Sequence, residues 1–352
     1  MRIKQLDGVR AVAIALVVLE HGLNLPMGWA GVDLFFVLSG FLITRILRRT
    51  KEEPYYWTRF YIKRATRILP PMMLALLLSA IFYRPNLGAW WIAYLLFGSN
   101  ISRVFHSEIS GRWDVFWSLA VEEHFYLIWP IAIRYLRRRS LLILLICVVL
   151  AEPVIRGFAT PHVSFLAIYF LTPFRLDGLA AGAFLALALE SERDAARIRS
   201  LSVPLLCAST ALLVLCTFYV PGFNRRANSL AFNSVGYSFV ALISVSAIAF
   251  VLLRPNSLAT RLLSLKPVVF IGVISYGIYL FHHVILDLVA SVSLPKAMFA
   301  LQVSAAFAIT LFFCWLSFRW FESPVIAWGH AKASHLAPGA ADGKAQTQAN
   351  AG

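Results

Sequence analysis

The stretch LDGVRAVAIALVVLEHGLNLPMGWAGVDLFFVLSGFLITRIL, residues 6–47, decides the fold. It contains two apolar segments, 9–25 and 31–47, each long enough for a membrane-spanning helix. The first segment also carries Arg10 and His21, which a simple membrane anchor does not need. In a helix these residues are three turns plus about 20° apart, so both fall on one face, ~16 Å apart along the axis. Ionisable groups in membrane helices usually face a protein interior or a wet cavity, so this face is expected to line a site.

The composition of the whole chain agrees with membrane-spanning helices. Of the 352 residues, 60% are hydrophobic and 14% are charged, whereas about 25% are charged in an ordinary soluble protein. The net charge of +15 would suggest nucleic-acid binding in a soluble protein, but here the cations lie in short loops between apolar blocks. We therefore predict an all-α, polytopic helix bundle in the lipid bilayer, with no nucleic-acid partner.

The apolar blocks predict about ten transmembrane helices. They are 9–25, 31–47, 69–84, 114–133, 141–158, 166–189, 200–220, 229–253, 268–290 and 297–320. One further block, 88–99, is too short to cross a membrane, and a crossing there would put the two most basic loops on opposite sides. It is expected to be a re-entrant or interfacial segment.

The span count also predicts the orientation of the chain. With ten spans, both termini lie in the cytoplasm and most Lys and Arg residues lie in cytoplasmic loops. Arg225 and Arg226 are an exception, because they fall in an outer loop. Residues 1–330 are expected to form a single transmembrane domain, and the Ala/Gly-rich residues 331–352 a disordered cytoplasmic tail.

The basic loop before the third span contains a candidate anion site. Arg64 and Arg67 are three residues apart and are neighbours if this segment is helical. Pro70–Pro71 is expected to open the next span, where a missing N–H costs little. The two arginines either set the topology or bind a phosphorylated ligand through their forked guanidiniums.

The fourth span carries polar residues at its entrance. Glu122, Glu123 and His124 are adjacent, so they cannot all share one helix face. They either cap an interfacial helix or place at least one glutamate in a functional site.

Two later spans contain further candidates. Arg175 and Asp177 form either a structural ion pair or a substrate contact, and the small residues that follow them suit close helix packing. His283 and Asp287 are one helical turn apart and can pair. The spacing from His282 to Asp287 matches the HxxxxD pattern of soluble glycerolipid acyltransferases, a weak signal that chance readily produces.

Other catalytic patterns are missing from the sequence. It contains no Gly-rich phosphate loop, GxSxG elbow or HExxH motif, and no spacing of Cys and His typical of a metal site. The four cysteines fall in apolar blocks and are interpreted as small hydrophobic residues. No metal is expected.

Taken together, these motifs resemble the acyltransferase-3 family of integral membrane O-acyltransferases. The chain shows in family order Arg10-x10-His21, GVDLFFVLSGFLIT, RATR, FWSLAVEEHFYLIWP, FRLDGLAAGAFLA, ISYGIYLFHH and FESP, over about residues 3–325. The resemblance implies transfer of an acyl group, often acetyl, from cytoplasmic acyl-CoA to a hydroxyl of a glycan or lipid-linked glycan. It also implies a place in the bacterial inner membrane and a role in modifying cell-envelope polysaccharides.

The resemblance assigns roles to particular residues. Arg64 and Arg67, with Arg10, would hold the phosphates of acetyl-CoA. His21 would act as general base or carry the acyl group transiently, and Glu122 would orient the imidazole or bind acceptor hydroxyls. Beyond these motif residues, Glu123, Arg175, Asp177 and His282 are candidate substrate contacts.

Two departures from the family pattern stand near the predicted site. His124 stands where glutamine is commoner, and Glu20 precedes His21 where a neutral residue is usual. The alternative function is a proton-coupled transporter or flippase that uses His21, Glu122 and the His283–Asp287 pair as relay groups. Transporters often show internal repeats, and none is evident here.

Overall fold

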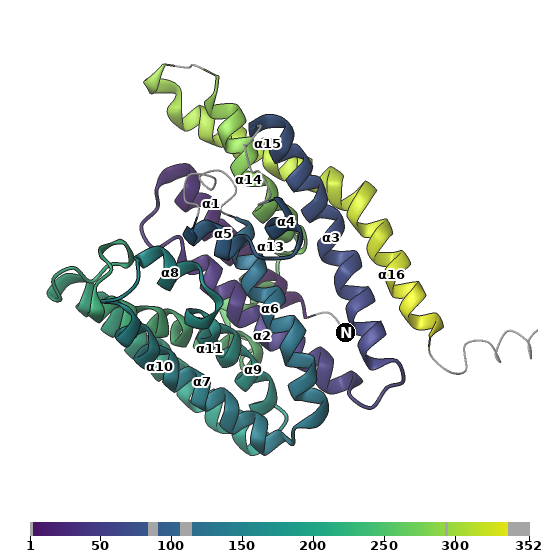
Figure 1. Cartoon of the computed structure of the whole chain (residues 1–352), viewed down its shortest axis with the longest axis vertical. Helices are drawn as coiled ribbons and strands as arrows, with labels where there is room; N and C mark the ends of the chain where they lie inside the picture. Colours follow the sequence, from purple (N-terminus) through teal and green to yellow (C-terminus); the bar gives the residue numbers. More distant parts are fainter. Residues whose placement is uncertain (1–2, 84–90, 106–114, 293–294, 337–352) are drawn as a thin grey trace, which may run out of the picture. The chain divides into compact units, whose positions relative to one another are not determined.

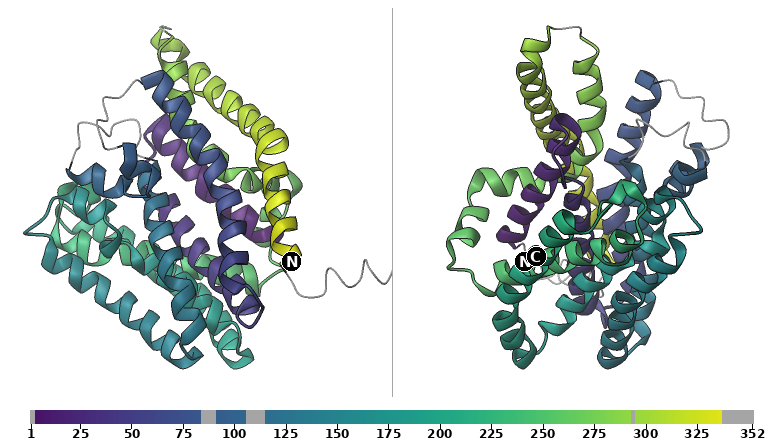
Figure 2. Two further views of the ribbon diagram at one scale, coloured as in Figure 1. Left: turned by 45° about the vertical axis from the view of Figure 1, so that its right-hand side comes forward. Right: turned by 90° about the vertical axis from the view of Figure 1, so that its left-hand side faces the viewer.

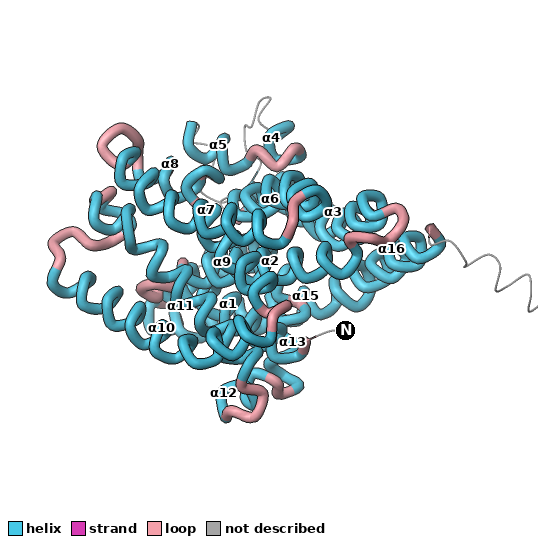
Figure 3. The backbone as a smooth tube through the Cα atoms, turned by 90° about the horizontal axis from the view of Figure 1, so that it is seen from below, coloured by secondary structure: helices cyan, strands magenta, loops and turns pink. Residues whose placement is uncertain are grey.

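The computed structural model describes residues 3–83, 91–105, 115–292 and 295–336, and throughout these residues the regular structure is helical, without strands (Figure 3). The chain divides into two compact units. The first unit comprises residues 1–45 and 85–279, and the second comprises 46–84 and 280–352. The predicted all-helical class is confirmed, and each unit is described separately below.

Six helices in the described residues are long and apolar enough to cross a membrane. They are α2 (Ala30–Thr50), α3 (Tyr56–Tyr83), α7 (Arg138–Ala159), α10 (Glu192–Tyr219), the helix Phe232–Leu253 formed by η5 (Phe232–Gly236) and α11 (Tyr237–Leu253), and the helix Phe299–His335 formed by α15 (Phe299–Ser317), η7 (Phe318–Glu322) and α16 (Ser323–His335). A bent pair, α13 (Lys266–Val273) and α14 (Ser275–Ala290), raises the number to seven if it is one span. Membrane-length helices are thus present, in smaller number than the ten predicted.

Two predicted spans are interrupted. The block 166–189 is divided into α8 (Phe165–Phe170), η3 (Thr172–Phe174) and the short apolar helix α9 (Leu176–Ala188). Leu171 is extended and Pro173 lacks an N–H, so the α-helical hydrogen bonds cannot continue through this point. The block 268–290 bends by 71° between α13 and α14. The prediction of one continuous helix was therefore wrong for both blocks, because each contains a break.

The double proline does not open a span. α3 begins at Tyr56 and contains Pro70 and Pro71 in its interior. The helix therefore lacks two backbone N–H groups, and the carbonyls one turn earlier lose the hydrogen bonds that these groups would have donated. Because α3 is continuous from Tyr56, Arg64 and Arg67 do lie one turn apart on a helix, as their spacing predicted.

Short helices fill the region predicted to be re-entrant or interfacial. α4 (Trp91–Leu95) and α5 (Ser99–Phe105) are separated by a turn in which Phe97 has a positive φ of 57°. Neither helix is long enough to cross a bilayer. Residues 88–90 of the predicted segment lie outside the described residues. At the other end of the chain α16 continues to His335, and residues 337–352 of the predicted tail are outside the described part.

Close backbone contacts hold the first unit together. A Cβ atom added to Gly40 of α2 would lie 1.9 Å from the Leu179 carbonyl oxygen of α9, and one added to Gly182 would lie 2.0 Å from the Val37 oxygen. Only glycine permits this approach, which bears out the predicted role of small residues in α9. α10 and α11 also run side by side, and α9 packs on α7 and α11 (Figure 1).

The helix that carries Arg10 and His21 is α1 (Lys4–Leu23). It packs mainly along α13, with further contacts to α12 (Leu258–Leu263) and α11. Asn24 ends it in the left-handed conformation, with its N–H bonded to the Leu19 carbonyl.

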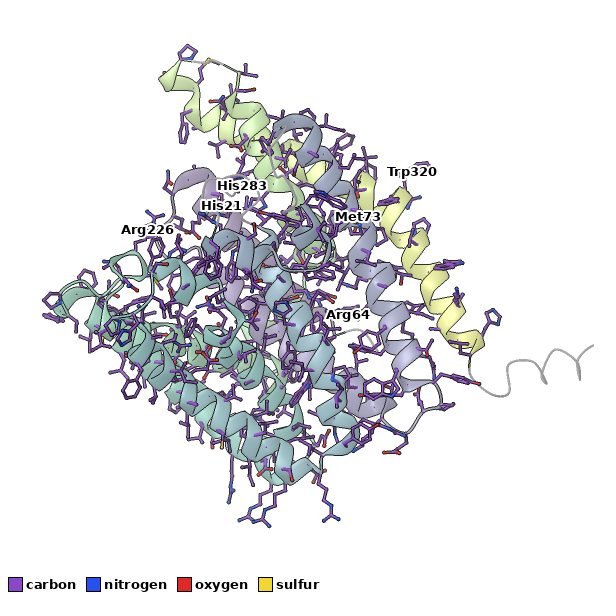
Figure 4. All side chains as sticks on the ribbon, viewed as in Figure 1. His21, Arg64, Met73, Arg226, His283 and Trp320 are labelled. Atoms are coloured by element: carbon purple, nitrogen blue, oxygen red, sulfur yellow. The ribbon has the colours of Figure 1, made fainter. Side chains whose placement is uncertain are left out.

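In the second unit α3 and α16 lie side by side (Figure 2). Their outer surfaces are apolar: Leu77 and Ile81 of α3 are more than half exposed, and so are Trp320 and Trp328 of the final helix. Trp320 lies at the outer edge of this unit (Figure 4). Exposed apolar residues on long helices are what a surface in contact with lipid requires.

Candidate active site

Arg10 and His21 lie on one continuous helix, α1, as predicted. Arg10 Nη1 donates to Asp7 Oδ1 at 3.2 Å, and the Asp7 side chain is buried. His21 lies in the last turn of α1 and is exposed (Figure 4). The helix therefore carries a guanidinium near its start and an imidazole near its end.

Glu122 is held by two hydroxyl groups. It lies on α6 (Phe116–Tyr135), where Oε1 accepts from Ser39 Oγ of α2 at 2.7 Å and Oε2 accepts from Tyr126 OH at 3.0 Å. Each carboxylate oxygen thus has at least one donor, which fixes the orientation of the group.

The neighbouring polar residues of α6 do not share one direction. Glu123 is partly buried, and His124 Nδ1 forms a 2.7 Å hydrogen bond with Thr172 Oγ1 of η3. Thr172 also accepts from Asn100 Nδ2 at 3.0 Å. Glu122 therefore faces α2 while His124 faces η3, as the 100° angle between helix neighbours predicted.

Arg175 and Asp177 are fully buried but do not pair with each other. Arg175 Nη2 donates to Asp33 Oδ1 of α2 at 2.7 Å, and Asp177 Oδ2 lies 2.9 Å from Arg156 Nη1 of α7. Each forms an ion pair with a residue from another helix, so the ion pair considered between Arg175 and Asp177 is replaced by two pairs with other partners. Asp33 and Arg156 were not among the predicted site residues.

Arg156 completes a group of buried charges with Glu152. The Glu152 carboxylate lies 3.1 Å from Arg156 Nη1, and its other oxygen accepts from the Leu176 N–H. A sequence signal for this pair exists, because Glu152 and Arg156 are opposite charges one turn apart inside the apolar block 141–158.

Aromatic rings enclose the Arg175 guanidinium. Its Cζ atom lies 4.3 Å from the ring centroid of Tyr237, 5.2 Å from that of Tyr169 and 5.9 Å from that of Trp117. These rings come from α11, α8 and α6. They place negative ring faces around a buried cation.

A second arginine shares one of these rings. Arg225, in η4 (Arg225–Ala227), forms an ion pair with Glu20 of α1, and its Cζ lies 4.8 Å from the Tyr169 centroid. Glu20 is the residue before His21, so the turn that carries Arg225 is joined to the helix end that carries the imidazole.

The second unit contains the predicted donor arginines. Arg64 and Arg67 lie on α3 and are partly buried. Arg67 interacts electrostatically with Glu322 of η7, whose Oε1 accepts from Ser317 Oγ at 3.0 Å. A buried carboxylate therefore faces this basic helix.

The histidines of α14 also lie in the second unit. His282 is completely buried, and His283 Nδ1 lies 3.7 Å from Asp287 Oδ2, which confirms the predicted pair. Asp287 additionally accepts from Tyr83 OH at 2.9 Å. No group of three His, Cys, Asp or Glu side chains within the described ranges is arranged to hold a metal ion.

Comparison with known proteins decides the family. The family model described as an acyltransferase domain matches residues 3–319, almost the whole chain. The chain belongs to the acyltransferase-3 family. The family assignment made from the seven motifs is thereby confirmed, and the protein is an acyltransferase.

Several relatives of this acyltransferase are named as bacterial O-acetyltransferases. It is 31% identical over 354 residues to peptidoglycan O-acetyltransferase OatA of Listeria monocytogenes, with 92% of this chain and 56% of the relative covered. It is 27% identical to O-acetyltransferase OatA of Staphylococcus aureus, covering 91% and 56%, and 27% identical to the putative peptidoglycan O-acetyltransferase YrhL of Bacillus subtilis, covering 91% and 54%. The chain thus spans about half the length of these relatives. No solved structure matches it.

Proposed function

We propose that this acyltransferase moves an acetyl group from cytoplasmic acetyl-CoA to a hydroxyl of a cell-envelope glycan, with peptidoglycan as the first acceptor to test. The observation that carries the proposal is the match of the acyltransferase domain to residues 3–319, together with relatives named as peptidoglycan O-acetyltransferases. A lipid-linked glycan precursor presents the same hydroxyls and is the second acceptor to test.

The donor site is proposed to involve Arg64, Arg67 and Arg10. Guanidiniums one turn apart on α3 suit the phosphates of a CoA molecule, because each can bind two oxygens of one phosphate. The ion pair of Arg10 with Asp7 fixes a third guanidinium near the start of α1. The ~16 Å rise from Arg10 to His21 suits an extended pantetheine arm that lies along this helix.

His21 is proposed to be the catalytic group. As a neutral imidazole it can take the proton of the acceptor hydroxyl while the oxygen attacks the thioester carbonyl, a role worth ~10²–10⁴-fold in rate. It can alternatively attack the thioester itself and pass the acetyl group on. Glu122, fixed by Ser39 and Tyr126, is proposed to orient the imidazole or to bind acceptor hydroxyls.

The remaining predicted site residues divide into two groups. Burial and strong ion pairs with Asp33 and Arg156 favour a structural role for Arg175 and Asp177. Glu123 and His282 stay proposed acceptor contacts.

We further propose that the protein lies in the bacterial inner membrane with both termini in the cytoplasm. The basic segments 45–67 and 134–139 then face the cytoplasm, where acetyl-CoA is made. Ten crossings satisfy this orientation if α1, α6 and the two broken blocks, 166–189 and 268–290, cross as well as the six long helices.

Thioester consumption tests the proposal. The purified protein in nanodiscs would be given acetyl-CoA and either soluble peptidoglycan fragments or a lipid-linked precursor, with free thiol and acetyl ester measured together. His21→Ala is expected to abolish acceptor-dependent CoA release, and Arg64→Ala to raise the KM for acetyl-CoA. Arg261→Ala is a matched control, because Arg261 is an exposed arginine of α12.

Two outcomes would contradict the proposal. CoA release that His21→Ala leaves unchanged would remove His21 from the mechanism. A wild-type protein that moves a glycan or protons across proteoliposomes without consuming any acyl-CoA would support the transporter alternative.

A further inference from the structure

Two unusual features of the sequence meet in the structure. Glu20 places a carboxylate directly before His21, and Arg225 places a cation in a loop predicted to be on the outer side. These residues are 205 positions apart, yet Glu20 Oε1 and Arg225 Nη2 form a charge-assisted hydrogen bond. The Glu20 carboxylate therefore offsets the positive charge of Arg225, which falls in a loop predicted to lie on the outer side. Arg225 in turn offsets the negative charge of Glu20 near the end of α1.

Arg225 is also held by aromatic rings. Its Cζ lies 4.8 Å from the Tyr169 centroid and 5.6 Å from that of Trp29, and both rings are buried. Trp29 directly precedes α2, and Tyr169 belongs to α8. One guanidinium thus connects α1, α2 and α8 to the loop between α10 and α11.

The loop on either side of Arg225 is fixed by hydrogen bonds. Asn224 Oδ1 accepts from the backbone N–H groups of Arg226 and Ala227, and Asn228 Nδ2 donates to the carbonyls of Thr160 and Val163. The Arg225 backbone therefore has little freedom, and its side chain acts as a short tether to α1.

The Glu20–Arg225 pair is more shielded than an ordinary surface ion pair. The Arg225 and Glu20 side chains are 18% and 16% exposed, whereas Arg138 and Asp194, a comparable pair in the same unit, are 34% and 35% exposed. Partial burial strengthens the attraction, because water screens it less.

We infer that Glu20 and Arg225 are positioning residues, which fix the His21 end of α1 against the segment 220–229 and so set where the imidazole meets the acceptor. The helix ends only three residues after Glu20, and His21 follows the tethered residue directly. The inference rests on the proposed function of His21. Neither residue needs to touch the reacting atoms.

The test compares three variants with wild type in the acetyl-transfer assay: Glu20→Gln, Arg225→Gln and the exchange of both charges, Glu20→Arg with Arg225→Glu. Misplaced catalytic groups lower the rate of transfer, so each single variant is expected to lose about tenfold in kcat for acceptor-dependent transfer. The KM for acetyl-CoA should change less than twofold. The exchange should recover part of the lost kcat, and Asp194→Asn should alter neither parameter.

A second readout is independent of catalysis. Amide hydrogen exchange at residues 221–230 and 16–23 is expected to be faster in Glu20→Gln than in wild type, and unchanged in Asp194→Asn. Tethering predicts that both segments respond together, because one ion pair joins them.

The possible results separate the inference from the proposed function. A kcat per folded molecule that the single variants leave unchanged overturns the inference and assigns the pair a merely structural role. Equal changes in kcat and in the KM for acetyl-CoA, without recovery in the exchange, also overturn it. If wild type shows no acceptor-dependent transfer at all, the proposed function fails, and unchanged hydrogen exchange in Glu20→Gln then overturns the tether as well.

Discussion

Two arginines of the first unit are completely buried, and their surroundings differ sharply. Arg156 and Arg175 each have no exposed surface, and each forms an ion pair. Burial of an arginine is costly unless its five N–H groups find acceptors. Arg156 meets this requirement with every side-chain nitrogen, whereas Arg175 meets it only in part.

Every nitrogen of Arg156 has an oxygen partner. Nε donates to the Asn233 carbonyl at 2.8 Å, and Nη2 donates to Ser238 Oγ at 2.7 Å. Nη1 donates to the Phe174 carbonyl and to Glu152, and also lies close to Asp177. This side chain joins α7, η3, α9 and α11, which makes it a central connection of the unit.

Arg175 has one strong hydrogen bond and many ring contacts. Among the described residues its Nε and Nη1 atoms, and Asp33 Oδ2, have no hydrogen-bond partner. Aromatic rings surround the guanidinium instead, with Tyr237 at 4.3 Å. Ring faces attract a cation but replace hydrogen bonds only in part. The Arg175–Asp33 pair is therefore less completely satisfied than the Arg156 network.

Replacing Arg156 is expected to have the largest effect. Arg156→Met would leave two carboxylates, Glu152 and Asp177, buried without their cation, and two carbonyls without their donor. Breaking a buried charge network of this kind costs ~3–5 kcal/mol of unfolding free energy. Denaturant unfolding of the purified protein in detergent measures the loss. A loss as small as that of Arg175→Met would show that the two arginines are energetically alike.

Replacing Arg175 is expected to lower the unfolding free energy by less than replacing Arg156 does. A second substitution, at Asp33, should recover most of that loss. Arg175→Met leaves only Asp33 unpaired, which should cost about 2–3 kcal/mol. Adding Asp33→Leu should return the unfolding free energy to within ~1 kcal/mol of wild type, because aromatic surroundings accept apolar side chains. The same measurement on Arg156→Met with Asp177→Leu should show no such recovery, since the carbonyl acceptors stay unpaired.

The smallest change removes a single acceptor from Arg156. Ser238→Ala deletes one hydroxyl, which accepts from Arg156 and donates weakly to Asp177 at 3.4 Å, and keeps both carboxylates, so about 1 kcal/mol should be lost. Thr217→Ala is a matched control, because within the described part of the chain its hydroxyl bonds to a carbonyl of its own helix. If Ser238→Ala proved as stable as this control, the hydrogen bonds of Arg156 would not explain the contrast with Arg175.

The sequence predicted these charges only in part. Arg175 and Asp177 were recognised because they are charges inside an apolar block, and they are buried as their setting implied. Their partners were missed, since Asp33 is 142 positions from Arg175 and only the fold brings them together. Local spacing did predict the His283–Asp287 pair, which is one helical turn apart.

The fold was predictable to a similar extent. Composition and the length of the apolar blocks predict a helical membrane protein, and the glycines of α9 indicate close packing. The breaks at Leu171–Pro173 and at Ile274 were not predicted, because the hydropathy of a segment does not indicate where its helix bends. At Pro70 and Pro71 the sequence predicted the start of a helix, whereas α3 continues through both prolines.

Tyr169 contacts both the Glu20–Arg225 pair and the Arg175–Asp33 pair, and this shared contact affects whether the free energies of substitutions in the two pairs are additive. Its ring centroid lies 4.8 Å from Cζ of Arg225 and 5.2 Å from Cζ of the buried Arg175. Residues that share a partner do not contribute independently to stability. The Glu20–Arg225 pair and the buried Arg175–Asp33 pair are accordingly coupled through one ring, so substitutions at Glu20 and Asp33 should be non-additive. In a homologous chain, a change at one of these positions would alter which residues are tolerated at the other.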